Sequence, residues 1–95
     1  MITSDKCYVY ILGSCDEAGR LRTYVGWTNN LDQRVKRHNA GKGARSTRGR
    51  QWKLLYVEMF QSREAAMSRE WHLKRDRRLR RDLSLLMGLK KGVHK

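Results

Sequence analysis

The alternation of apolar and polar positions divides the first quarter of the chain into two short strands. Residues 7–12 (CYVYIL) are aromatic, β-branched or aliphatic, which predicts a strand. A polar stretch with two glycines at 13–20 predicts a turn, and residues 21–26 (LRTYVG) predict a second strand. The segment 7–26 therefore predicts a β-hairpin.

Helical spacing begins directly after the hairpin. Asn30 as N-cap, with Gln33 three residues later, approximates a capping box and predicts a helix from about 31 to 39. One face of this helix is apolar at two positions and carries Arg34 and His38 at the other two. An arginine on a core-directed face needs a partner or a route into a cleft.

The second half of the chain predicts a loop, a strand and two helices. Residues 41–51 form a glycine-rich basic stretch without apolar periodicity, which predicts a loop. Residues 52–60 (WKLLYVEMF) are so rich in apolar side chains that we expect the central strand of the sheet here. Residues 62–81, with Ser62 as N-cap, predict a long helix, and 82–91 predict a short last one.

The order β-β-α-β-α-α indicates an α+β fold, a small three-stranded antiparallel sheet flanked by helices. The sequence has no proline, internal repeat or linker. We therefore expect residues 1–95 to form a single domain, with a core at about 6–80 and a C-terminal helix and basic tail at 81–95.

The net charge of the chain points to a polyanionic partner. The 95 residues include 22 Lys and Arg against 9 Asp and Glu, a formal net charge of +13. Nucleic acid is the expected partner, and an anionic membrane surface is the lesser alternative. Residues 34–53 hold eight of the basic residues and no acid, and apolar residues interrupt the run, which indicates the surface of folded elements.

Other features narrow the class of protein. No apolar run approaches the roughly 20 residues of a membrane span, and the N-terminus lacks signal-peptide features, so we expect a cytoplasmic protein without a membrane partner. In a reducing compartment Cys7 and Cys15 are expected to be small buried or half-buried residues, not a disulfide. The three histidines form no metal-ligand pattern.

Two groups of residues could carry chemistry. Tyr8 and Tyr10 point to one face of the first strand, and the hairpin could bring Tyr24 beside them, although strand aromatics also occur without a function. Glu70 lies in the middle of the long basic helix. It could form an i,i+4 ion pair with Lys74, or hold a divalent cation against a phosphate.

Taken in order, these features resemble the GIY-YIG nuclease family. Val9-Tyr10 and Tyr24-Val25-Gly26 stand where the two motifs of the family name fall, although Tyr8 replaces the first glycine. Arg34 lies eight residues after the second motif, where the family's catalytic arginine is expected. The helix around Glu70 resembles the one that supplies the family's metal-binding glutamate. The stretch 38–48 nearly matches the small, single-domain bacterial members.

The resemblance implies phosphodiester hydrolysis that depends on a divalent metal, Mg²⁺ or Mn²⁺, at Glu70. Arg34 would offset the charge that develops on the phosphate. Family precedent suggests a tyrosine as general base, with Tyr24 as first choice and Tyr10 in support. His38 is a relay or alternative base, or else packs against the helix face and contacts a phosphate.

Binding would fall to the basic residues of this chain, because no further DNA-binding module is expected. Phosphate contacts with little base reading and strong salt dependence would follow. The expected contacts lie on the first helix, the basic loop and the long helix: Lys36, Arg37, Lys42, Arg45, Arg48, Arg50 and Lys74.

The sequence thus predicts a metal-dependent endonuclease, on DNA rather than RNA, with low sequence specificity or with structure selectivity and no small-molecule cofactor. The alternative is a non-catalytic nucleic-acid-binding module on the same scaffold. A basic adaptor for an acidic protein or ribosomal RNA would fit the charge but leave the spacing of the motifs unexplained.

Overall fold

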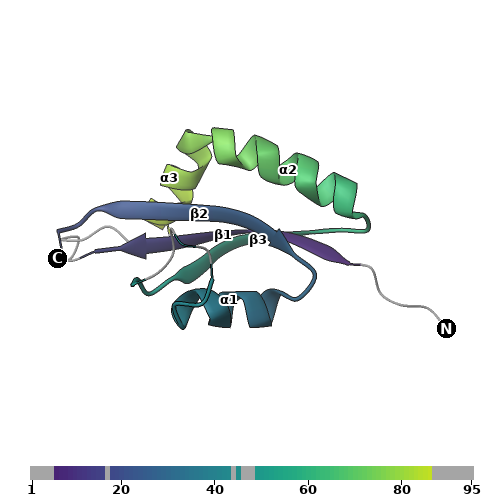
Figure 1. Ribbon diagram of the computed structural model, residues 1–95. Coiled ribbons are helices and arrows are strands. Elements are labelled where there is room, and N and C mark those ends of the chain that lie inside the picture. The colour runs from purple at the N-terminus through teal and green to yellow at the C-terminus, as the bar shows by residue number, and fades with distance from the viewer. Residues whose placement is uncertain (1–5, 17, 44, 46–48, 87–95) are drawn as a thin grey trace.

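The computed structural model describes residues 6–16, 18–43, 45 and 49–86. The chain forms the expected α+β order of elements (Figure 1). In chain order these are β1 (Cys7–Cys15), β2 (Leu21–Thr28), α1 (Leu31–Asn39), β3 (Lys53–Phe60), α2 (Arg63–Arg75) and α3 (Arg77–Leu86). None of the helices in these described ranges is long and apolar enough to cross a membrane.

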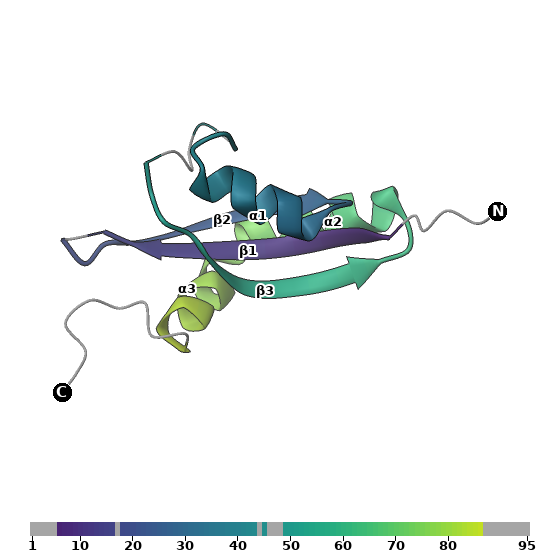
Figure 2. The same ribbon diagram turned by 90° about the horizontal axis from the view of Figure 1, so that it is seen from below.

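The sheet has the strand order β2-β1-β3, and both pairs are antiparallel. Helix α1 covers one face of the sheet, and α2 and α3 cover the other (Figure 1). The expectation that the third strand would be central is wrong, because β1 occupies that place and β3 is an edge. Seen from below, α1 lies over β1 and β2 and leaves this face of β3 open (Figure 2), so Val57 and Met59 are 41% and 46% exposed.

The hairpin is longer than its apolar positions predict. The register continues to Cys15 opposite Leu21 at the turn, and to Tyr8 opposite Thr28 at the other end. The small side chain of Ser14 is nevertheless buried, so the strand continues where polarity predicts a turn. Asp16 closes the turn, since its carboxylate accepts a hydrogen bond of 2.9 Å from the backbone N–H of Arg20.

The alternating side chains of β1 build a separate apolar cluster on each face of the sheet. Val9 and Ile11 pack towards α2 and α3, together with Cys7, Val25, Ala66 and Leu73. Tyr10 and Leu12 pack towards α1 and the strand β3, together with Trp52. Cys7 is buried and Cys15 is half-buried, and they are not joined by a disulfide, which confirms the expectation from the sequence.

The first helix matches its prediction, and the second does not. Helix α1 is capped by Asn30, whose Oδ1 accepts a 3.2 Å bond from the N–H of Gln33. Ser62 caps α2 as predicted, but that helix ends at Arg75 and not at residue 81. Asp76 leaves the helical conformation and caps α3, because its Oδ1 accepts from the N–H of Leu79 at 3.1 Å. The expected short last helix therefore begins earlier, and residues 87–95 lie outside the described part.

Arg80 joins the two helices to the sheet. Its Nε and Nη2 atoms donate to the carbonyl oxygens of Leu73 and Lys74 at 3.1 and 2.7 Å, and Nη1 donates to the hydroxyl of Thr23 at 2.8 Å. The last carbonyl groups of an α-helix have no partner inside the helix. One guanidinium thus satisfies the end of α2 and attaches it to β2.

We expect Arg80→Ala to lower the free energy of unfolding by about 1–3 kcal/mol, because two helix-end carbonyls and a hydroxyl lose their donor. The measurement is urea denaturation, in which the midpoint should fall at constant slope. Arg78→Ala is the matched control, since Arg78 is an exposed arginine on the same helix. Equal midpoints for the two variants would contradict the role of Arg80.

Candidate active site

The candidate site is centred on the phenol of Tyr10, which projects from β1 towards α1 and has no exposed surface. Its hydroxyl oxygen lies 3.0 Å from Nε2 of His38, which is buried in the last turn of α1. The hydrogen bond links the central strand to the helix, and which atom donates depends on the tautomer of His38. The structure therefore brings together two residues that the sequence placed 28 positions apart.

The hairpin adds a second phenol to this pair. The ring centroid of Tyr24, on β2, lies 4.8 Å from that of His38 and 6.2 Å from that of Tyr10. Tyr24 is half-buried, whereas Tyr10 is fully enclosed. The expectation that the hairpin brings these two tyrosines together is met. Tyr8 instead lines a cavity with Asn29 and neighbouring residues at the start of α1.

Gly26 makes room for the cluster. It is the ladder partner of Tyr10, so any side chain here would share the face on which the phenol lies. An ideal Cβ at this position would approach the hydroxyl oxygen and Cζ of Tyr10 to 2.6 and 2.9 Å, and Cε2 of Tyr24 to 3.0 Å. Such contacts are too short for any residue larger than glycine. Steric exclusion therefore explains why the last residue of the second motif is glycine.

Arg34 reaches the cluster from the exposed side of α1. Burial raises the pKa of Tyr10 well above its ordinary value, and the charges of Tyr24 and Glu70 raise it further, whereas the charge of Arg34 and a hydrogen bond with it lower it. Of the two alternatives that the sequence left for this arginine, the structure gives the partner, which is the phenol of Tyr10. The charges of Arg34 and Glu70 both change the pKa of Tyr10, although the two helices that carry these residues cover opposite faces of the sheet.

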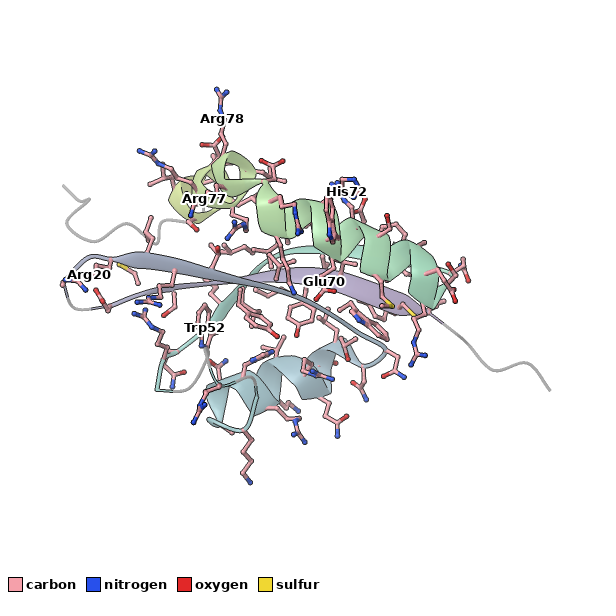
Figure 3. The ribbon with its side chains drawn as sticks, turned by 45° about the horizontal axis from the view of Figure 1, so that its top comes forward. Arg20, Trp52, Glu70, His72, Arg77 and Arg78 are labelled. Carbon is pink, nitrogen blue, oxygen red and sulfur yellow. The ribbon has the colours of Figure 1, made fainter. Side chains whose placement is uncertain are left out.

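Glu70 points from α2 towards the sheet (Figure 3). Its Oε2 lies 3.3 Å from Nζ of Lys74, and the side chains of the two residues are 20% and 53% exposed. The ion pair that the sequence offered as one alternative is therefore present. One carboxylate oxygen of Glu70 takes part in it. Its partner, Lys74, is the more exposed of the two residues and has a long, flexible side chain.

Glu70 is the candidate metal ligand of the site. Within the described ranges no three His, Cys, Asp or Glu residues gather where they could hold a metal ion. A site with a single protein carboxylate suits Mg²⁺ or Mn²⁺ better than zinc, because Mg²⁺ retains waters and accepts phosphate oxygens as ligands, whereas zinc requires several nitrogen or sulfur ligands. The donor set thus fits a hard cation whose remaining ligands come from substrate and water.

The imidazole of His38 is held neutral. Burial lowers its pKa below the ordinary value of 6.5, and the nearby charges of Arg34 and Arg37 lower it further. Gly43 packs against Nδ1 so closely that a Cβ there would collide with the ring. An imidazole that is unprotonated at neutral pH suits a relay or base, and its burial suits packing against the helix face, so both roles that the sequence left open for His38 remain.

The expected nucleic-acid contacts divide into exposed and engaged residues. Lys36, Arg37, Lys42 and Arg45 are exposed on α1 and the following loop. Arg50 lies 3.5 Å from Asp16, and Lys74 is paired with Glu70, so both are partly engaged within the chain. Arg48 lies outside the described residues.

Asn39 has a role that sequence reasoning missed. Its side chain accepts from the N–H of Trp52 at 2.5 Å and donates to the carbonyl oxygen of the same residue at 3.1 Å. The amide therefore joins the end of α1 to the residue before β3, so the two ends of the basic loop lie together next to His38. The only sequence signal is its position next to His38 in the family-like stretch.

The fold and the order of the motifs match a known family of catalytic domains. The family model described as the GIY-YIG catalytic domain matches residues 6–82, and the chain belongs to this family of nucleases. The UPF0213 protein CPE1444 of Clostridium perfringens is 51% identical over 67 residues, which cover 70% of this chain and 68% of that protein. The UPF0213 protein SpyM50708 of Streptococcus pyogenes serotype M5 is 47% identical over 70 residues, 73% and 72% of the two chains.

A solved structure is also similar. The solution NMR structure of the UPF0213 protein BH0048 from Bacillus halodurans is 41% identical and covers 87% of this chain and 86% of its own, with a TM-score of 0.45. The names of these relatives state no substrate.

We expect Gly26→Ala to destabilise the protein by about 1–3 kcal/mol, because the added methyl group collides with the enclosed Tyr10. The measurement is the free energy of unfolding in urea. Adding Tyr10→Phe removes the atom of closest contact, so the double variant should lose less than the sum of the two single losses. Strict additivity would count against the steric explanation.

The lowered pKa of His38 predicts how stability depends on pH. The unfolded chain takes up a proton near pH 6.5, but the folded chain does so only at lower pH. The contribution of His38 is therefore fully present above pH 6.5 and is lost as the pH falls through the pKa of the folded state. Unfolding measured between pH 8 and 5 should show a shallower pH slope for His38→Gln than for the exposed control His72→Gln. Equal slopes would contradict this origin.

Proposed function

We propose that the chain hydrolyses phosphodiester bonds of nucleic acid, DNA in the first place, with the help of a divalent metal ion. The observation that carries this proposal is the convergence at Tyr10, where an arginine from one face of the sheet and a carboxylate from the other both act on one phenol. A substrate phosphate bound at the surface near Tyr24 would have a cation, Arg34, and a metal ligand, Glu70, within reach. Membership of the GIY-YIG family supports the same reaction.

Arg34 is the residue we assign to the phosphate. It lies on the exposed side of α1, so its guanidinium can turn towards a bound strand while it remains beside the buried phenol. A guanidinium binds two oxygens of a phosphate in a forked geometry. It would offset the negative charge that the phosphate gains as water attacks.

Glu70 is the residue we assign to the metal. A bound Mg²⁺ or Mn²⁺ would polarise the phosphate and stabilise the leaving oxygen. The chain itself contributes the negative charge that attracts the cation, in a surface that is otherwise strongly basic. Lys74 holds the carboxylate in an ion pair of 3.3 Å, which a cation bound at Glu70 would replace.

The accessible phenol, Tyr24, is our choice for contact with the attacking water. Tyr10 has no exposed surface, and its raised pKa makes it a poor base, so it acts as a fixed support that holds His38. The imidazole, unprotonated at neutral pH, lies next to the Tyr24 ring and is available to receive a proton during the reaction. The three side chains thus divide the tasks of contact, support and proton uptake.

Binding with low sequence specificity, or selectivity for nucleic-acid structure, agrees with the exposed basic residues. Lys36, Arg37, Lys42 and Arg45 can reach phosphates without any groove-reading element among the described residues. Phosphate contacts position a strand but carry no sequence information. Affinity would therefore fall steeply with salt.

We expect Arg34→Ala and Glu70→Gln to reduce cleavage by about 10²–10³-fold or more, because each removes a charge that acts on the transition state. Labelled single-stranded, duplex and branched DNA, and matching RNA, are incubated with Mg²⁺ or Mn²⁺ at fixed salt. Chelation of the metal should abolish cleavage by the unmodified protein. Unfolding midpoints and DNA affinity check that the variants remain folded and bind.

Arg78→Ala and Glu64→Gln serve as charge-matched controls, since both residues are exposed and lie outside the proposed site. They should cleave at the rate of the unmodified protein. If the unmodified protein and all four variants show the same background on every substrate, the chain is a nucleic-acid-binding module and not an enzyme.

A further inference from the structure

A basic cavity separate from the candidate active site lies between α3 and the β1–β2 hairpin. Its volume is about 390 Å³. The residues that line it are Gly19, Leu21, Thr23, Arg77, Arg80, Arg81 and Ser84. None of them belongs to the Tyr10 cluster or to the contacts assigned to the basic loop. Three arginines and the Thr23 hydroxyl make it a cavity for an anion.

One wall of the cavity is rigid. The guanidinium of Arg80 is fixed by hydrogen bonds to Leu73, Lys74 and Thr23, so its charge does not have to be ordered when a ligand binds. The Thr23 hydroxyl accepts one of these bonds and keeps its own proton to donate. The Ser84 hydroxyl donates to the carbonyl oxygen of Arg80 at 3.0 Å, which braces the same wall.

The other wall carries two arginines without a counter-ion. Arg77 and Arg81 stand one turn apart on α3, where like charges repel each other. The carboxylates that form ion pairs in the described part of the chain are those of Asp16, Glu58 and Glu70, each with a different partner. Both arginines line the cavity, and neither forms an ion pair with a side chain of the described residues.

The cavity is connected to the proposed active site through α2. Arg80 binds the carbonyl oxygen of Lys74, and the ammonium group of Lys74 pairs with Glu70. Arg77 follows Glu70 by seven residues, across the break between α2 and α3 at Asp76, which is on the order of 10 Å, or about three nucleotides at the rise of a B-form strand. A strand held at Glu70 can therefore reach the cavity.

We propose that this cavity binds a backbone phosphate of the nucleic acid, a few nucleotides from the phosphate that is cleaved. The inference rests on the proposed function and adds a binding site on α3 that holds the strand along the α2–α3 side of β2. The expected ligand is the phosphodiester and not the base, because the wall consists of guanidinium and hydroxyl donors. Contact at this site fixes the direction in which the strand leaves the active site.

The test compares single substitutions that each remove one positive charge from α3. Arg77→Ala and Arg81→Ala change the wall of the cavity, whereas Arg78 points away from the sheet and serves as the matched control (Figure 3). All are made in the full chain with Glu70→Gln, and equilibrium binding to a labelled DNA duplex is measured without metal at 50–200 mM salt.

We expect affinity to fall about 3- to 10-fold for each cavity variant and less than twofold for Arg78→Ala. The double variant Arg77→Ala/Arg81→Ala should also make the negative slope of log affinity against log salt less steep by about 0.9, the value for one lost phosphate contact on duplex DNA. Equal losses for all three positions, or an unchanged slope in the double variant, would overturn the proposal. The measurement needs no cleavage, so it stands or falls separately from the nuclease activity.

Discussion

The contact between Tyr10 and Gly26 is the constraint on which the site depends. A large buried phenol on the central strand can lie over the neighbouring strand only because its ladder partner has no side chain. That phenol in turn holds His38 by a hydrogen bond of 3.0 Å and keeps Tyr24 within ring contact. Two motifs that look like a sequence signature are therefore the two halves of one packing arrangement.

Residues from both faces of the sheet influence the same side chain, the phenol of Tyr10. Tyr10 is influenced by Arg34 from the helix on one face and by Glu70 from the helix on the other, so a cation and a carboxylate are kept apart by the fold and do not neutralise each other. Lys74 is instead the ion-pair partner of the carboxylate. A flexible surface ion pair is weak, so it yields readily to a stronger competitor.

Local sequence signals predicted the elements better than their arrangement. The caps at Asn30 and Ser62 are where the sequence placed them, because side-chain capping is decided within a few residues. The strand at 53–60 was misplaced to the centre, since apolar density does not tell which neighbour a strand finds. Asp76 was hidden in a run of basic residues with helical propensity, yet it ends one helix and caps the next.

The same limit applies to the site. The spacing of the motif residues pointed to the tyrosines, Arg34, His38 and Glu70 as one group, whereas the difference in accessibility between the two phenols arises only from packing on α1. The hydrogen bond from Arg80 to Thr23 joins α3 to β2 across 57 positions, and no local pattern encodes it.

The side-chain amide of Asn39 lets the basic loop change without moving the residues around Tyr10. It holds both backbone groups of Trp52, as a neighbouring strand would, so the loop between them begins and ends at fixed points. Lengthening a closed loop adds only slowly to its entropy cost. The loop can therefore differ in length and composition from one relative to the next, while the tyrosines, the imidazole and the helix beside it keep their places. Changes in the loop can therefore accumulate on this scaffold without disturbing the packing around Tyr10.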